Sequence, residues 1–77
     1  MSKLPLVSAA QMARILRHMG FVLIRQKGSH ASFRHKDGRT TVIPFHKGED
    51  LGRGLIRTIL QDIDLSIAEY ERLRLET

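Results

Sequence analysis

Four consecutive residues, Lys27-Gly28-Ser29-His30, place an ionisable imidazole directly after a Gly-Ser pair that is typical of a tight turn. Histidine is the side chain that takes up and releases a proton near neutral pH. The flanking segments carry four cations, Arg25, Lys27, Arg34 and Lys36. A proton acceptor among cations suits metal-independent RNA cleavage, in which a base deprotonates a ribose 2′-hydroxyl and cations stabilise charge on the phosphate. We therefore take His30 as the candidate base.

Several side chains around His30 have candidate supporting roles. Lys27, Arg25 and Arg34 are candidates for holding or stabilising the phosphate, and Ser29 or Ser32 for donating a hydrogen bond. The same composition also fits a surface histidine on a basic binding face that performs no catalysis. Both interpretations stay open at this point.

The other three histidines have weaker claims to chemistry. If the strands join through two-residue turns, His30 lies opposite Phe45, and His46 just beyond the strand end comes near it. His46 is then a candidate general acid or phosphate contact, or else a loop histidine that orders the next turn. We interpret His18 and His35 as structural or incidental, with His35 partly buried and hydrogen-bonded on the helix-covered face. The histidines show no compact ligand spacing, so we expect no metal site and no cofactor.

Helical periodicity appears at both ends of the chain. Ser8 with Gln11 fits a capping box before an apolar stripe, which predicts a helix over 8–19. A second stripe begins at Leu55 and predicts a helix to about Asp62. Ser66 and Glu69 suggest another capping box and a short third helix. We interpret the glycines of Gly52-Arg53-Gly54 as allowing close packing of the second helix on the sheet.

Three segments of strand-like composition lie between these helices, at 21–27, 30–36 and 39–44. The turns between them are Gly28-Ser29, which suits a type II′ turn, and Asp37-Gly38, a strong hairpin signal. The predicted class is therefore α+β, with the order α-β-β-β-α and a short C-terminal helix. Both main helices would cover one face of a three-stranded antiparallel sheet and leave the other face open.

Two-residue turns would also fix which side chains share a face, because successive residues in a strand alternate. The predicted helix-covered face is apolar: Val22, Ile24, Ala31, Phe33 and Val42. The predicted open face holds His30 and the cations: Arg25, Lys27, His30, Ser32, Arg34, Lys36 and Arg39, with Leu23, Thr41 and Ile43. Its five cations are the predicted RNA-binding residues. A one-residue slip or a bulge would exchange these assignments.

Composition limits the range of functions. The 77 residues predict one domain, and a formal charge of +5 favours an anionic partner such as nucleic acid. Seven of the eight acids follow Gly48, so the basic character belongs to the first two thirds of the chain. The chain has no cysteine and no apolar run of membrane-spanning length, from which we expect a cytoplasmic protein.

The order of these motifs resembles the HicA family of bacterial and archaeal toxins. The residues that carry the resemblance are Leu4-Pro5, Gly20-Phe21, Gly28-Ser29-His30, Asp37-Gly38, Pro44 with His46, and the amphipathic segment Leu55 to Leu60. The resemblance covers nearly the whole chain, as one domain over 1–77. It implies a fold like that of a double-stranded-RNA-binding domain and a toxin that cuts mRNA, with His30 as the catalytic histidine. It also implies a HicB-type antitoxin that blocks the active site, and His46 matches a recurrent histidine of the family.

Two other functions remain compatible with the residues. One is a non-catalytic RNA-binding module that uses the same basic face. The other is a protein-interaction adaptor whose basic surface binds an acidic partner. Within the nuclease hypothesis, the general acid could be His46, Lys27 or water.

Overall fold

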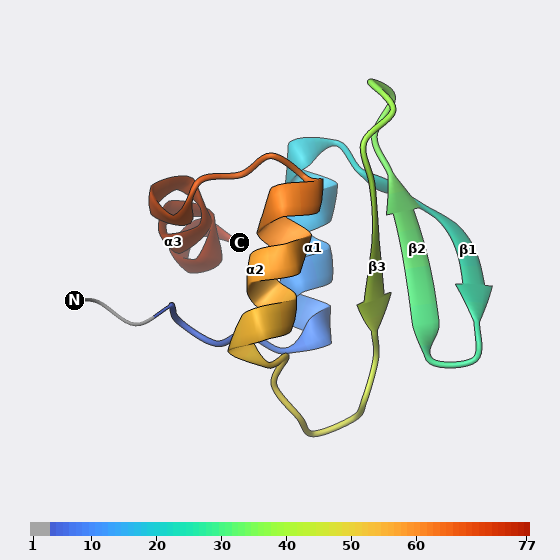
Figure 1. Ribbon diagram of the computed structural model, residues 1–77, viewed down its shortest axis with the longest axis horizontal. Helices are drawn as coiled ribbons and strands as arrows, with labels where there is room; N and C mark the ends of the chain where they lie inside the picture. Colours follow the sequence, from blue (N-terminus) through green and yellow to red (C-terminus); the bar gives the residue numbers. More distant parts are fainter. Residues whose placement is uncertain (1–3) are drawn as a thin grey trace.

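The computed structural model describes residues 4–77, so residues 1–3 of the predicted domain lie outside the described part. The elements are α1 (Ala9–Met19), β1 (Val22–Lys27), β2 (His30–Arg34), β3 (Thr40–Pro44), α2 (Arg53–Asp62) and α3 (Ile67–Glu76). This order confirms the predicted α+β class with the sequence α-β-β-β-α and a further C-terminal helix (Figure 1).

Local capping signals set the helix boundaries. Ser8 caps α1, where its hydroxyl accepts from the Gln11 N–H (3.2 Å) and the Gln11 side chain accepts from the Ser8 N–H (2.9 Å). This is the predicted capping box. At the start of α3, the hydroxyl of Ser66 accepts from the Glu69 N–H (3.2 Å), which is one half of the predicted box.

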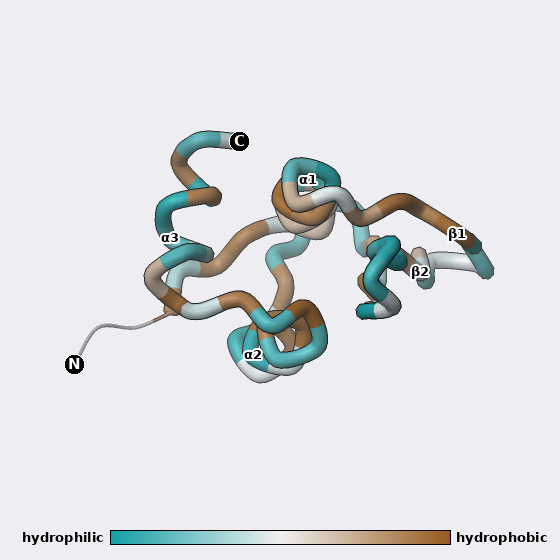
Figure 2. Tube along the Cα trace, turned by 90° about the horizontal axis from the view of Figure 1, so that it is seen from above, coloured by the Kyte–Doolittle hydropathy of each residue, from teal (hydrophilic) through white to brown (hydrophobic). Residues whose placement is uncertain are grey.

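The two helices α1 and α2 lie against one face of the sheet, and α3 lies on their other side (Figures 1 and 2). Side chains from the three helices and from β2 and β3 fill one apolar core. The largest fully buried side chain is Tyr70 of α3, whose hydroxyl donates to the Pro5 carbonyl oxygen. Helix α3 therefore closes the core on the side away from the sheet. Among residues 4–77, no helix is long and apolar enough to cross a membrane.

The strands form an antiparallel sheet in the order β1-β2-β3. The first turn is as predicted, since Lys27 lies opposite His30 and Gly28 has a φ of +58°. The second turn is one residue longer than predicted. The His35 N–H donates to the Arg39 carbonyl oxygen (2.8 Å), which leaves three residues in the loop and places Gly38 at φ +102°.

This longer turn shifts β3 by one residue, so that His30 lies opposite Pro44 rather than Phe45. Since side chains alternate along a strand, the shift exchanges the two faces of β3. Thr41 and Ile43 face the helices and are buried, whereas Val42 is exposed on the open face. The predicted faces of Thr41, Val42 and Ile43 are therefore wrong.

A bulge changes the faces of β1 as well. Leu23 lies opposite the buried Phe33 and Arg25 opposite Ser32, which leaves Ile24 as an extra residue between them. Val22 and Ile24 were predicted beneath the helices, and Leu23 on the open face; all three assignments are wrong. Strand β1 is the edge strand farther from the helices (Figures 1 and 2), so all six of its residues remain exposed.

Candidate functional site

His30 is the first residue of β2 and follows the tight turn at Gly28-Ser29 directly. Its side chain is exposed on the face of the sheet that no helix covers. Lys27, the last residue of β1, lies directly opposite on the same face. Side chains in such a cross-strand pair have Cβ atoms about 5 Å apart. The turn therefore places His30 and Lys27 in neighbouring positions at the end of the sheet, as the sequence predicted.

Two more cations share this face. Arg25 lies opposite Ser32, and Arg34 lies opposite Val22, while alternation along β2 keeps Ser32 and Arg34 on the side of His30. Both arginines are exposed. We use the name open face for this surface, formed by Val22, Ile24, Arg25 and Lys27 of β1, His30, Ser32 and Arg34 of β2, and Thr40, Val42 and Pro44 of β3.

The open face carries no carboxylate. Among residues 4–48 the one acid is Asp37, in the turn between β2 and β3. Its carboxylate accepts two bonds from the Arg39 Nε (2.9 and 3.1 Å) and one from the Arg39 backbone N–H (3.1 Å). The side-chain bond from Arg39 lowers the pKa of Asp37 to about 2, and the backbone bond from Arg39 contributes to the same shift. The cations of the open face therefore remain available to an anionic ligand.

Arg39 was predicted to bind RNA on the open face, and this placement is wrong. Its guanidinium donates to the Ile63 carbonyl oxygen and lies 5.2 Å from the ring centroid of Phe21, a core residue. Together with the Asp37 bonds, these contacts hold Arg39 on the helix side of the sheet. Lys36 lies in the three-residue turn and is exposed at the edge of the open face.

His35 has a structural position, as predicted. Its ring packs edge-on against Phe21 with a centroid distance of 5.1 Å. The Asp37 backbone N–H donates to His35 Nδ1 (3.1 Å), and Nε2 lies 3.2 Å from where a Cβ on Gly20 would be. Gly20 therefore suits the end of α1 for two reasons: its φ is positive, and a side chain at this position would crowd the His35 ring.

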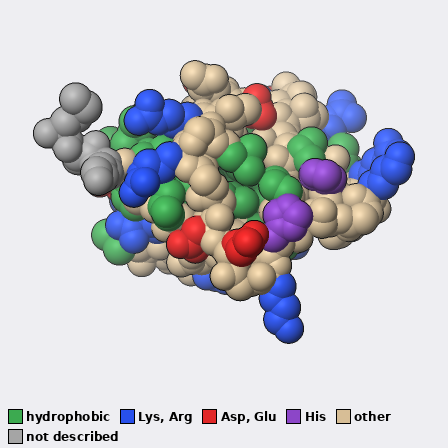
Figure 3. Space-filling model, turned by 60° about the horizontal axis from the view of Figure 1, so that its bottom comes forward, with side chains coloured by type: hydrophobic (Ala, Val, Ile, Leu, Met, Phe, Trp, Pro, Cys, Tyr) green, Lys and Arg blue, Asp and Glu red, His purple; other side chains and the backbone are tan. Residues whose placement is uncertain are grey.

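The loop after β3 is attached to the turn that carries His30. The Phe45 N–H donates to the Ser29 carbonyl oxygen (2.7 Å), and the exposed His46 follows. His46 starts a turn in which its carbonyl accepts from the Glu49 N–H (3.2 Å). His30, Ser29 and His46 therefore occupy the same end of the molecule. Figure 3 brings this end forward and shows two histidine side chains exposed on it.

The glycines at the start of α2, which lies at this end of the molecule, do not have the packing role predicted for them. The N-cap residue Gly52 supplies no side-chain hydrogen bond, and a Cβ on Gly52 or Gly54 would meet no atom within 4 Å. The proposal that these glycines allow close packing on the sheet is wrong.

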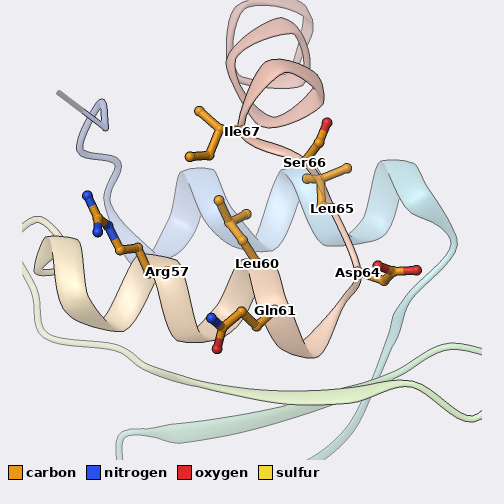
Figure 4. A pocket seen from close by; sticks show the side chains of 7 residues that line it. All are labelled: Arg57, Leu60, Gln61, Asp64, Leu65, Ser66 and Ile67. Atoms are coloured by element: carbon orange, nitrogen blue, oxygen red, sulfur yellow. The ribbon is translucent and has the colours of Figure 1, made fainter. Parts of the chain in front are cut away.

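Sequence reasoning missed one feature of the open face and one pocket. The feature is the group of exposed aliphatic side chains, which only the bulge and the longer turn bring to this face. The pocket, of about 580 Å³, lies between α2 and α3 (Figure 4) and is lined by Arg57, Leu60, Gln61, Asp64, Leu65, Ser66 and Ile67. It contains none of the candidate residues. Within residues 4–77, no three His, Asp or Glu side chains are grouped so that they could hold a metal ion.

The fold and this face define a small α+β domain with a histidine at the end of a basic, uncovered sheet. A sequence model described as "HicA toxin of bacterial toxin-antitoxin" matches residues 9–65, from α1 to the residue before the cap of α3. The chain belongs to the HicA toxin family, and its role is that of a toxin in a toxin–antitoxin system. No curated protein sequence matches the chain.

Proposed function

We propose that this toxin is a metal-independent endoribonuclease that cleaves mRNA, with His30 as the general base. The observation that carries the proposal is the position of His30 on the open face, opposite Lys27 and on the same side as Arg25 and Arg34, with no carboxylate among them. Membership of the HicA toxin family supports it. An anionic RNA backbone is the ligand that this charge distribution favours.

The chemistry follows from the groups on this face. Neutral His30 removes the proton of a ribose 2′-hydroxyl, and the oxygen attacks the adjacent phosphorus. The bond between phosphorus and the 5′-oxygen then breaks, which leaves a 2′,3′-cyclic phosphate and, after protonation of the leaving oxygen, a 5′-hydroxyl. Lys27, Arg25 and Arg34 stabilise the negative charge that develops on the phosphate oxygens.

Protonation of the leaving oxygen requires a general acid, for which we propose His46 or Lys27. His46 lies in the loop that the Phe45–Ser29 hydrogen bond attaches to the His30 turn, and Lys27 lies directly opposite His30. Ser29 is a further phosphate contact in this proposal, and Lys36 extends the RNA-binding surface at the other end of the sheet. We also propose that the protein acts in the cytoplasm and that its antitoxin is of the HicB type.

Expression of the toxin without its antitoxin tests this function. We expect wild-type protein to arrest growth and His30→Ala protein, produced at equal level, to permit it. His18→Ala is the matched control, because His18 is an exposed histidine at the end of α1 away from the Gly28-Ser29 turn (Figure 1). Growth arrest by His30→Ala as strong as that by wild type would contradict a catalytic role for His30.

One observation favours a second candidate, a non-catalytic RNA-binding module. Among the described residues, no side chain forms a hydrogen bond with His30 and so none orients its imidazole. A catalytic histidine often has such a partner. If the protein is a binding module, growth arrest depends only on RNA affinity. His30→Ala protein that binds RNA as tightly as wild type should then arrest growth equally.

A further inference from the structure

Three exposed aliphatic side chains lie on the open face among its cations. Val22 is 59% exposed, Ile24 52% and Val42 46%. We call these three residues the aliphatic strip. Figure 2 shows that the hydrophobic part of β1 lies at the outside of the molecule, away from α1 and α2. No helix of the described chain covers the strip.

The surface around Val22 and Ile24 is hollowed. A depression of about 420 Å³ is lined by Gly20, Val22, Ile24, Arg34, His35 and Lys36. It lies toward the turn between β2 and β3, at the opposite end of β2 from His30. Arg34 and His30 are four residues apart along that strand, which corresponds to about 13 Å.

RNA does not account for this strip. Sequence-tolerant binding of single-stranded RNA uses aromatic side chains on which bases stack. All four aromatic residues of the chain are elsewhere: Phe21, Phe33 and Tyr70 are buried, and Phe45 packs against the core. Aliphatic side chains also gain nothing from phosphate groups. Exposed aliphatic residues beside a depression are instead typical of a surface that another protein covers.

The charges specify the chemistry of that protein. Arg34 and Lys36 line the depression, Arg25 and Lys27 follow along β1, and the one acid nearby, Asp37, is bonded to Arg39. A complementary partner presents carboxylates for these cations and aliphatic side chains for the strip.

We propose that an acidic segment of the antitoxin, bearing aliphatic side chains, is anchored on the aliphatic strip and on Arg34 and Lys36, of which Arg34 lies about 13 Å along β2 from His30. This inference rests on the proposed antitoxin partnership. From this anchor the antitoxin extends along the open face toward His30. Antitoxin binding and RNA cleavage therefore share the cations of this face, whereas the aliphatic strip contributes to antitoxin binding alone.

The test measures binding of the HicB-type antitoxin encoded with this toxin by isothermal titration calorimetry, without RNA and in a His30→Ala background. Antitoxin binding is then measured independently of RNA cleavage. A negative result in this assay rejects the proposed anchor without rejecting the proposed ribonuclease activity. The variant is Val22→Thr/Ile24→Thr, which keeps the β-branched shape and removes apolar surface. Leu75→Thr is the control, since Leu75 is 77% exposed on α3.

We expect the double variant to bind the antitoxin at least about tenfold more weakly than its parent. The control variant should bind unchanged, and the double substitution in wild-type toxin should leave cleavage of RNA within about twofold. The affinity should also fall as salt is raised from about 0.05 to about 0.5 M, because charge pairs contribute.

Three results would overturn the proposal. They are unchanged antitoxin affinity of the double variant, absence of antitoxin binding by the parent, and affinity that salt does not alter. Loss of RNA cleavage with unchanged antitoxin affinity would assign the strip to RNA instead.

Discussion

The hydroxyl of Thr41 on β3 donates a hydrogen bond to the carboxylate of Asp62 at the end of α2 (3.0 Å). Thr41 is 3% exposed and lies opposite Phe33, so this bond connects the helix-covered face of the sheet to the helix above it. The side chain of a buried polar residue requires such a partner. The bond is consistent only with the register in which His30 lies opposite Pro44.

This register predicts opposite effects at two neighbouring positions. Thr41→Lys buries an ammonium group under α2 and should lower the free energy of unfolding by at least about 3 kcal/mol. Val42→Lys places the same group in solvent on the open face and should change it by less than about 1 kcal/mol. Urea denaturation of both variants measures the difference. If Val42→Lys were instead the less stable variant, the register with a two-residue turn between β2 and β3 would be the correct one.

The turn between β2 and β3 should respond to acid. The pKa of Asp37 is about 2 in the folded chain, mainly because of its side-chain hydrogen bond with Arg39, and 3.8 is its ordinary value. Since the pKa of Asp37 is lower in the folded chain, its ionised carboxylate stabilises the fold. This contribution is complete above pH about 4 and is lost as pH falls toward about 2. We expect the stability of wild type to decline more steeply in this range than that of Asp37→Asn. Parallel curves would show that the bonds with Arg39 do not stabilise the fold.

Alanine substitutions at two glycines with open surroundings distinguish the cost of backbone strain from the cost of a steric clash. A Cβ on either Gly28 or Gly54 meets no atom within 4 Å, but Gly28 has a φ of +58°. Gly28→Ala should therefore cost about 1–2 kcal/mol. Gly54→Ala, in the first turn of α2, should be neutral or stabilising by up to about 1 kcal/mol. Equal thermal stability of the two variants would mean that the turn before His30 does not require a positive φ.

Helix α3, which lies beyond the region matched to the HicA family, should be essential for stability. Tyr70→Ala removes its largest buried side chain and should cost about 3–5 kcal/mol, whereas Tyr70→Phe removes only the bond to Pro5 and should cost about 1 kcal/mol. Leu75→Ala, on the exposed side of α3, provides the comparison. If Tyr70→Ala unfolded at the same urea concentration as Leu75→Ala, α3 would not belong to the cooperative unit.

Local signals in the sequence predicted the elements and the position of His30. The Ser8–Gln11 capping box and the Gly28-Ser29 turn each depend on a few adjacent residues, and the structure contains both. Because His30 directly follows that turn, its pairing with Lys27 also follows from local geometry. This is why the catalytic candidate and its neighbouring cation could be placed from the sequence alone.

The faces of β1 and β3 depend on contacts between distant residues. Asp37-Gly38 fits a two-residue or a three-residue loop, and the choice is made by burial of Ile43 and by the bond from Thr41 to Asp62, which is 21 residues away. The bulge at Ile24 lies on an edge strand that no helix constrains, and no turn residue marks it in the sequence. The aliphatic strip was missed for these two reasons.

The most direct test of the central claim is incubation of purified toxin with a long single-stranded RNA in the presence of a chelator, followed by identification of the fragment ends. The account predicts 2′,3′-cyclic or 3′-phosphate ends from wild type, and intact RNA from a folded His30→Ala variant that still binds RNA. Equal cleavage by the two proteins, or RNA left intact by wild type that binds it, would contradict the claim that His30 is the base of a metal-independent ribonuclease.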